Sequence, residues 1–329
     1  MPLSPILVTG AAGFAGGHLL DLLAGDARPI VAWRQASQAH TPSTSSGAAS
    51  LVSWLDVELL QPDSIADALR ETQPSEVYHL AGIAHQGASW QQTTPTLEVN
   101  VLGTHHLLDG LRRVGSTAPV LVIGSATVYR PSNHGLDESS AIGPTSPYGL
   151  SKLGQELVSL HAHSVYEQPV IVSRSFNHIG PRQSPDFVAS SFARQIAEIE
   201  LKRRDPVIDV GNLEARRDLT DVRDTVRAYR EIVRRGRPGA IYNVCRGEAV
   251  AIRDLLDGLL AQTTVPIEVR VDPARMRPVD QPLLLGRYDR LNQDTGWTPM
   301  IPMRQTLGDL LQYWRDQLSA GAPASSEAR

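Results

Sequence analysis

The stretch Ile6-Leu7-Val8-Thr9-Gly10-Ala11-Ala12-Gly13-Phe14-Ala15-Gly16 decides the fold of this 329-residue chain. Its apolar start predicts a short buried strand, and leucines at 19, 20, 22 and 23 predict a helix after the glycines. Strand, glycine turn and helix in this order are the context that a dinucleotide fingerprint requires. Glycines at this spacing permit a tight turn, close approach to a pyrophosphate and an anion at the helix N-terminus. We therefore expect a dinucleotide here rather than a plain turn.

The alternation of strand and helix continues through the first half of the chain. Apolar strands are expected at 29–33, 51–56, 76–80, 120–123 and 169–173, with helices at 62–72, 94–114 and from 147 onward. Such alternation predicts a parallel sheet with helices on both faces. The expected fold class is α/β: a Rossmann-type doubly wound parallel sheet with a smaller C-terminal α/β substrate-binding domain. Residues 37–50 are rich in Ser, Thr, Gly and Ala, which predicts a surface loop.

Ligands of such sheets bind outside the carboxyl ends of the strands. The second strand ends in Trp33-Arg34, where an NAD site usually has a carboxylate for the adenine ribose. Arg34 is suited to a 2′-phosphate, so NADP(H) is favoured over NAD(H), although a solvated loop arginine is the plain alternative. Asp56, at the end of the third strand, is expected to contact adenine.

The segment Ser146-Pro147-Tyr148-Gly149-Leu150-Ser151-Lys152 predicts the chemistry. Pro147 suits the first turn of a helix, and Tyr148 and Lys152 then share one face. Leucines at 150, 153, 157 and 160 fall on the opposite side and are expected to anchor the helix to a core. A nearby ammonium is expected to lower the tyrosine pKa from about 10 and make it an acid/base. Lysine occurs only at 152 and 202, and arginine does not replace a compact charge.

Bulk composition excludes several classes of function. A net charge of −4 and a pI near 6.2 give no reason to expect nucleic acid or an anionic membrane. No apolar run reaches the roughly eighteen residues of a membrane helix, and no signal peptide is expected. The lone Cys245 suits a reducing compartment, so a cytoplasmic protein is expected. Neither His105-His106 nor His161-x-His163 has the spacing of metal ligands on a helix, so no metal is expected.

The second half of the chain departs from strict alternation after Ile179. We expect a dinucleotide-binding domain at 1–175, with its sheet completed by parts of 219–246. A mainly nucleotide-sugar-binding domain at 176–318 and a disordered tail at 319–329 follow. Two or three of five arginines are expected to line a groove for a diphosphate, namely those at 182, 216, 217, 275 and 277.

The motifs together resemble the extended short-chain dehydrogenase/reductase superfamily over almost the whole chain. Those that carry the resemblance, in order, are the glycine turn at 9–16, His79-Leu-Ala-Gly82, Asn100-Val-Leu-Gly-Thr104, Ser125, Tyr148-x-x-x-Lys152 and Arg217-Asp218. Within the superfamily the chain most resembles the GDP-4-keto-6-deoxy-D-mannose reductases. Three stretches carry this: 176–181, 192–200 and 210–224. Arg277-Pro278 with Leu284-Leu285-Gly286 resembles the diphosphate clamp of the related GDP-mannose dehydratases.

The resemblance implies reduction of the C4 keto group of GDP-4-keto-6-deoxy-D-mannose to GDP-D-rhamnose by a homodimer. It implies Tyr148 as proton donor, Lys152 as the residue that holds the nicotinamide ribose, and Ser125 as a hydrogen-bond donor to the same oxygen. The catalytic residues expected are Ser125, Tyr148 and Lys152. The cofactor residues expected are Gly10, Gly13, Phe14, Ala15, Gly16, Arg34, Asp56, Val57, Leu80, Ala81, Gly82, Asn100, Tyr148 and Lys152. The substrate residues expected are Ser125, Ala126, Thr127, Asn177, Arg182, Val188, Arg217 and Arg277.

Three other functions are compared with the residues around Ser125: dehydratase, epimerase and a non-catalytic regulatory protein. Related 4,6-dehydratases carry acidic residues directly after the serine or threonine, whereas this chain has Ala126 and Thr127, so dehydration is disfavoured. A nucleotide-sugar 4-epimerase with tightly held NAD stays open, because 125–129 resembles such enzymes. A non-catalytic NADP-binding regulatory protein is the remote alternative, and an intact Ser125, Tyr148 and Lys152 argues against it. Arg130 stands where the family usually has glycine after Val-Tyr, so the resemblance does not predict the conformation of the neighbouring loop.

Overall fold

The computed structural model describes residues 4–35, 50–85, 87–275 and 281–320. All of the expected loop at 37–50 except Ser50, and most of the expected tail at 319–329, therefore lie outside the described residues. Ser319 and Ala320 are the last residues of a helix. None of the described helices is long and apolar enough to cross a membrane.

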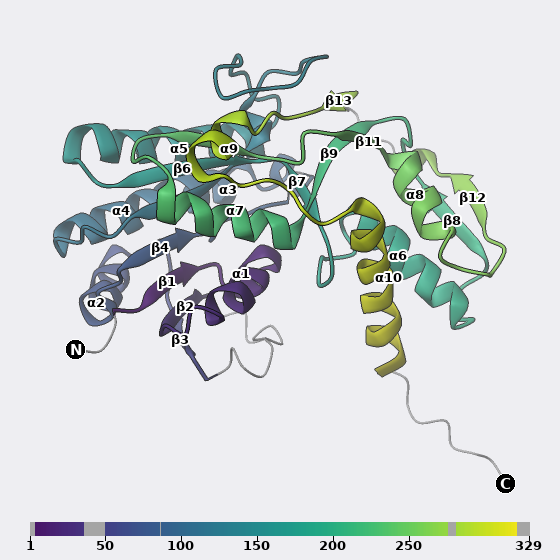
Figure 1. The fold of residues 1–329 in the computed structure, drawn as a ribbon, viewed down its shortest axis with the longest axis horizontal. Coiled ribbons are helices and arrows are strands. Elements are labelled where there is room, and N and C mark those ends of the chain that lie inside the picture. The colour runs from purple at the N-terminus through teal and green to yellow at the C-terminus, as the bar shows by residue number, and fades with distance from the viewer. Residues whose placement is uncertain (1–3, 36–49, 86, 276–280, 321–329) are drawn as a thin grey trace, which may run out of the picture.

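A seven-stranded parallel sheet forms the larger part of the molecule (Figure 1). Its strand order is β10-β6-β5-β4-β1-β2-β3, which confirms the doubly wound arrangement expected from the sequence. The strands are β1 (Ile6–Thr9), β2 (Ile30–Arg34), β3 (Val52–Asp56), β4 (Glu76–His79), β5 (Val120–Ser125), β6 (Val170–Ser175) and β10 (Ile241–Val244).

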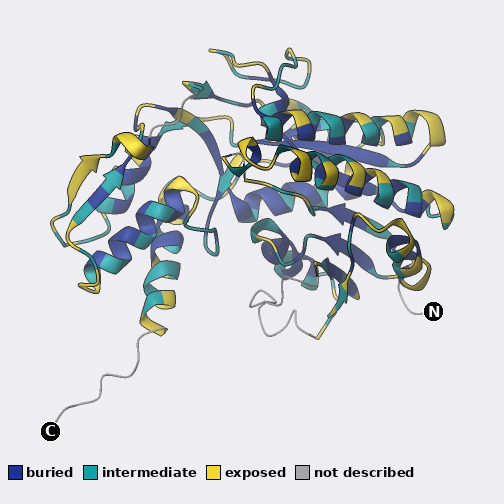
Figure 2. Cartoon of the chain, turned by 180° about the vertical axis from the view of Figure 1, so that it is seen from behind, coloured by how far each residue is buried: buried dark blue, intermediate teal, exposed yellow. Residues whose placement is uncertain are grey.

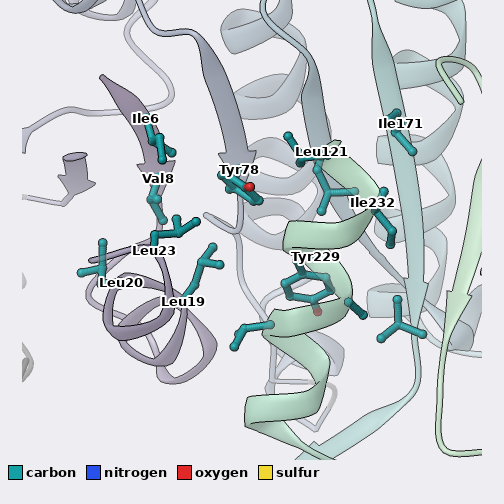
Figure 3. Close-up of a cluster of buried hydrophobic side chains, with 14 of the residues drawn as sticks. Ile6, Val8, Leu19, Leu20, Leu23, Tyr78, Leu121, Ile171, Tyr229 and Ile232 are labelled. Atoms are coloured by element: carbon teal, nitrogen blue, oxygen red, sulfur yellow. The ribbon is translucent and has the colours of Figure 1, made fainter. Parts of the chain in front are cut away.

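Helices cover both faces of this sheet because alternate strand residues point to opposite sides. Ile6 and Val8 pack with α1 (Phe14–Ala24), α7 (Val222–Arg235) and α9 (Asp289–Thr295), and Figure 3 shows part of this cluster. Leu7 instead packs with the other layer. That layer contains α2 (Pro62–Thr72), α4 (Gly103–Arg113) and α5 (Pro147–Tyr166). Figure 2 shows the sheet as a buried layer between helices with exposed outer faces.

Apart from α7, β10 and α9, the regular elements that follow Ser175 build a second, smaller assembly. Its main sheet has the order β11-β9-β13, with β7 also paired to β9, and β8 pairs with β12 separately. The strands are β7 (Asn177–Ile179), β8 (Val207–Val210), β9 (Arg216–Asp221), β11 (Ala249–Ala251), β12 (Glu268–Val271) and β13 (Leu283–Leu284). The helices are α6 (Val188–Glu200), α8 (Ile252–Leu260) and α10 (Met303–Ala320), which share a separate apolar core.

Short elements complete the described chain. They are η1 (Ala88–Trp90), α3 (Thr93–Leu97), η2 (Glu98–Leu102), η3 (Ala126–Val128) and η4 (Pro273–Arg275). The single helix expected at 94–114 is therefore interrupted: α3 and α4 are joined through η2, one wider turn.

The outward face of α5 contradicts the expectation for its leucines. Leu150 and Leu157 are 52% and 57% exposed, while Leu153 and Leu160 are half-buried. The buried side carries small and polar residues instead, namely Gly149, Ser151, Lys152, Gln155, Glu156, Ser159 and Ala162. A leucine stripe shows that one face is apolar, but not whether the chain's own core covers that face.

A buried ion pair fastens α5 to the sheet. The Arg174 guanidinium on β6 donates to both carboxylate oxygens of Glu156, at 2.8 and 2.6 Å, and each side chain is only 4% exposed. The guanidinium also lies 4.7 Å from the Tyr129 ring centroid. Removing one partner of such a pair leaves the other charge buried without compensation.

We expect Glu156→Gln to lower the free energy of unfolding by about 3 kcal/mol, measured by urea denaturation. Asp67→Asn is the control, because Asp67 pairs with Arg70 on an exposed face of α2. Its effect should stay within about 0.5 kcal/mol. Equal effects of the two variants would contradict this account of the buried pair.

Candidate active site

A cavity of about 1200 Å³ lies at the carboxyl ends of the parallel strands. Residues of the glycine turn, β5, α5, β7, α6 and β9 line it. The volume exceeds the roughly 300–1,000 Å³ of a pocket for one drug-sized ligand. The cavity is therefore large enough for a dinucleotide together with a second ligand.

The glycine turn leaves room for a ligand's phosphates. Gly10 adopts φ +66°, and a Cβ there would lie 2.5 Å from the Ala81 amide nitrogen. A Cβ on Gly16 would lie 2.4 Å from the Gly10 carbonyl oxygen. The N-cap of α1 is Gly13, with no side-chain cap and no acidic residue in the first turn. Uncapped amides at the positive end of a helix fit a pyrophosphate.

The carboxyl ends of β2 and β3 carry an ion pair. The Arg34 guanidinium donates to Asp56 at 2.7 Å and lies 5.6 Å from the Trp54 ring centroid. Arg34 lines the cavity together with Gln35 and Glu58, whereas Asp56 does not. The expected contact of Asp56 with adenine is therefore not supported, because its carboxylate is turned to its neighbour on β2.

The expected catalytic residues come together at one place in the cavity. Ser125 ends β5, and Tyr148 and Lys152 project from the first turns of α5; all three line the cavity. The helix begins there because Pro147 occupies its first turn and the Ser146 hydroxyl accepts from the Gly149 amide at 3.1 Å. The Tyr148 amide donates to the Ser89 hydroxyl at 3.2 Å, which ties this turn to η1.

The pKa of Tyr148 differs from the sequence expectation. Burial raises it to about 12, and a hydrogen bond with Ser125 opposes that change. The Lys152 nitrogen lies 6.0 Å from the Tyr148 ring centroid, and the expected lowering by this ammonium is not found. Desolvation destabilises a buried phenolate more than an ammonium at this distance stabilises it. Tyr148 is therefore protonated at neutral pH, the form that a proton donor requires.

Ser125 is arranged to donate. The Thr127 hydroxyl donates to the Ser125 oxygen at 2.9 Å, and the Thr127 amide donates to the same oxygen at 3.2 Å. The Ser125 proton then points to a further acceptor, such as the Tyr148 phenol oxygen or a substrate oxygen. Ala126 and Thr127 also line the cavity, so the positions after the serine offer a methyl group and a hydroxyl.

Two acceptors hold the Lys152 ammonium at the wall of the cavity. Its ammonium donates to the Ile123 carbonyl at 2.9 Å and to the Gln155 amide oxygen at 2.8 Å. Burial lowers its pKa to about 8. Because an ammonium has three protons, these two bonds leave one for a ligand in the cavity that Lys152 lines.

The remaining cofactor residues divide into two groups. The cavity is lined by Gly10, Gly13, Phe14, Ala15, Gly16, Val57, Leu80, Ala81 and Gly82. Asn100 is fully buried and does not line it. Its amide instead accepts from the Ile83 amide at 2.8 Å and donates to the Ile83 carbonyl at 3.1 Å. Asn100 thus supports the loop after β4, and its expected contact with the cofactor is not supported.

The substrate residues divide similarly. Asn177, Val188 and Arg217 line the cavity, with Arg217 donating to the Gln281 carbonyl at 2.7 Å. Arg182 does not line it, because its guanidinium pairs with Asp21 on α1 at 2.8 Å. Arg216 donates to the Ala249 carbonyl and also lies outside the lining. Arg277 and the side chain of Arg275 lie outside the described residues.

Several lining residues were not predicted from the sequence. His178 lines the cavity and stacks on Phe14 with ring centroids 5.8 Å apart. The segment 209–213 also lines the cavity, as does Arg217. His85 and Phe187 also line the cavity and meet at 5.8 Å between ring centroids. The motif at 210–224 was a sequence signal for the segment 209–213. No pattern in the sequence points to His85.

Comparison with known proteins gives the family. A family model described as GDP-mannose 4,6 dehydratase matches residues 7–310. A GDP-6-deoxy-D-mannose reductase of Pseudomonas aeruginosa PAO1 is 36% identical over 316 residues, which cover 95% of this chain and 98% of that protein.

Solved structures agree. The structure of RMD from Pseudomonas aeruginosa complexed with NADPH matches with a TM-score of 0.83 and 34% identity, covering 96% of this chain and all of that one. MoeE5 in complex with UDP-glucuronic acid and NAD matches with a TM-score of 0.82 and 27% identity, covering 95% and 99%. These matches extend along nearly the whole length of each protein. The chain therefore belongs to the GDP-mannose 4,6-dehydratase family of extended short-chain dehydrogenases/reductases.

Proposed function

We propose that the chain is a reductase that converts the C4 keto group of GDP-4-keto-6-deoxy-D-mannose to the hydroxyl of GDP-D-rhamnose. NADPH is the favoured reductant, and the enzyme acts as a cytoplasmic homodimer. The observation that carries the proposal is the meeting of Ser125, Tyr148 and Lys152 in one cavity beside a glycine turn fitted to a dinucleotide. The 36% identity to a GDP-6-deoxy-D-mannose reductase supports the choice of substrate.

Each catalytic residue has a separate role in reduction of the carbonyl group. A nicotinamide cofactor, when bound, supplies a hydride to the carbonyl carbon. Tyr148, protonated because its pKa is about 12, gives its proton to the oxygen as negative charge develops there. Ser125 donates a hydrogen bond to the same oxygen, which stabilises that charge. Lys152, with one N–H not used by Ile123 or Gln155, would donate it to the nicotinamide ribose of a bound cofactor.

Reduction is favoured over dehydration by the chemistry beside Ser125. Loss of water across C5 and C6 needs a carboxyl acid/base next to the keto sugar, and Ala126 and Thr127 cannot serve. Of the described residues, the carboxylates that line the cavity are Glu58, Asp186 and Asp209, on other segments. Asp209 is already paired with Arg204 and Arg270.

Arg34 supports the preference for NADPH. Between residues 30 and 58 the sequence has no other lysine or arginine. Its guanidinium lines the cavity at the carboxyl end of β2, where the adenine ribose of a dinucleotide lies in this fold. The RMD structure with NADPH supports the same choice.

The exposed apolar face of α5 supports a homodimer. Leu150, Leu157, Val165 and Tyr166 are each more than half exposed on this one helix, and Leu102, 47% exposed, is the last residue of η2, directly before α4. Exposed apolar residues gathered on one helix are typical of a protein–protein interface. A second copy of the chain, packed through α4 and α5, would bury the leucines that the monomer leaves in water.

Tyr148→Phe should abolish turnover while leaving cofactor binding unchanged. We expect at least a 100-fold loss of kcat, because the variant lacks the proton that the carbonyl oxygen must receive. Oxidation of NADPH with GDP-4-keto-6-deoxy-D-mannose measures turnover, and NADPH fluorescence measures binding. Tyr166→Phe, on the same helix, is the control and should keep wild-type activity.

Normal turnover in Tyr148→Phe would show that another group is the acid. If the wild-type protein oxidised no NADPH with GDP-, UDP- or dTDP-linked keto sugars, the reductase proposal would be wrong. Conversion of UDP-galactose with no net cofactor change would establish the epimerase instead.

Arg34→Leu should weaken NADPH binding roughly tenfold and leave NADH binding nearly unchanged. The reason is that only NADPH carries the 2′-phosphate that a guanidinium binds. Titration of both reduced cofactors by fluorescence checks this, with the exposed Arg70→Leu as control. Equal losses for the two cofactors would contradict a role in phosphate recognition.

Leu150→Glu combined with Leu157→Glu should convert a dimer to a monomer. Light scattering is expected to give twice the chain mass of 35.7 kDa for the wild type and a single chain for the variant. Met300→Glu, at an exposed apolar residue elsewhere, should remain dimeric. A wild-type protein of one chain mass at micromolar concentration would rule out this interface.

A further inference from the structure

Gln155 is the residue that contacts the Lys152 ammonium from within the same helix. Its side chain is fully buried, and its amide oxygen accepts from Lys152 at 2.8 Å. Its amide nitrogen donates in turn to the Thr104 hydroxyl on α4 at 2.9 Å. Gln155 does not line the cavity, so any effect on the reaction passes through Lys152.

The orientation of the Gln155 amide follows from the hydrogens around Thr104. The Thr104 hydroxyl donates its one proton to the Asn100 carbonyl at 2.8 Å. Its oxygen can then only accept, from Gln155 and from His79 Nε2 at 2.9 Å. A flipped amide would place its oxygen against this acceptor and its N–H groups against the Lys152 ammonium. The network therefore holds the acceptor atom toward Lys152.

The Thr104 hydroxyl also fixes the tautomer of His79. Because Nε2 must donate to Thr104, Nδ1 is the acceptor and receives the Thr9 hydroxyl proton at 2.7 Å. Burial lowers the His79 pKa to about 3, which keeps the ring neutral in this tautomer. The Thr9 oxygen also accepts the Ala81 amide at 3.2 Å. The chain of bonds thus runs from Thr9 at the end of β1 through His79 on β4, Thr104 on α4 and Gln155 on α5 to Lys152.

We propose that Gln155 is a positioning residue of the reaction: it holds Lys152 in place as an ammonium at the end of a buried, fully hydrogen-bonded network anchored at Thr104, His79 and Thr9. The proposal rests on the proposed function for the role of Lys152.

Among the described residues, the groups near the ammonium that can carry charge are Tyr148 on α5 and His79 at the end of β4, and both are neutral at neutral pH. Glu156 follows Gln155 directly, but its carboxylate pairs with Arg174. The ammonium is therefore held by neutral acceptors rather than by a counter-ion. A group held this way responds strongly to any change in those acceptors.

The two lysines of the chain make a direct test possible. With ¹³C-labelled lysine, the full-length protein gives two side-chain Cε signals, and Lys202→Arg identifies the signal of Lys152. Titration of that signal in the wild type should show a pKa near 8. The high-pH limb of kcat/KM should follow it, because activity is present below the Lys152 pKa and is lost as the pH rises through it.

Gln155→Met keeps the size of the side chain and removes the acceptor. We expect the Lys152 titration and the activity limb to move together to lower pH, with kcat/KM at pH 7.5 reduced roughly tenfold, which corresponds to about 1.4 kcal/mol. Gln155→Glu keeps an acceptor and adds negative charge. It should move both to higher pH and retain activity near neutrality.

Gln168→Met is the matched control, because Gln168 is also buried and donates to the Leu108 carbonyl at 2.8 Å, far along the helix layer. It should lower thermal stability as Gln155→Met does, with no change in the Lys152 signal. A Lys152 titration identical in the wild type, Gln155→Met and Gln155→Glu would overturn the proposal. The NMR result needs no substrate, so it stands or fails separately from an absence of turnover.

Discussion

Satisfying the polar groups that α5 buries is the constraint on which the rest of the site depends. The helix turns Lys152, Gln155 and Glu156 inward, and each has at least one hydrogen-bond partner within 3 Å on another element. An unpaired charge in that layer would cost more than most single interactions in the fold contribute. Matching partners had therefore to come from β5, α4 and β6 together, which fixes how the helix sits against the sheet.

The sequence predicted the elements better than their surroundings. Strand, turn and helix at 6–24 were expected in the right order, and Tyr148 and Lys152 were expected on one face. Those features are local, set by neighbours within a turn or a strand. The predicted lowering of the Tyr148 pKa was wrong. This pKa depends on how deeply the phenol is buried, which no local sequence pattern reports.

Partners distant in the sequence explain the other differences. Arg182 was expected to reach the substrate but meets Asp21, and Asp56 meets Arg34 across two strands. Asn100 supports a backbone segment that folds over it. Each side chain has the right chemistry for the role expected of it, and a competing partner from another element takes it instead. The name of the family likewise does not decide the reaction, because two side chains after Ser125 separate reduction from dehydration.

The place of β10 in the large sheet has a consequence for biosynthesis. β10 occupies one end of the sheet beside β6, yet β6 ends at Ser175 and β10 begins only at Ile241. A nascent polypeptide leaving the ribosome therefore carries an open β6 edge while the whole of β7, α6, β8, β9 and α7 is translated. Open edges of this kind recruit other strands and favour aggregation. The chain is thus exposed to aggregation while residues 176–240 are being translated, and this exposure ends once β10 can pair with β6.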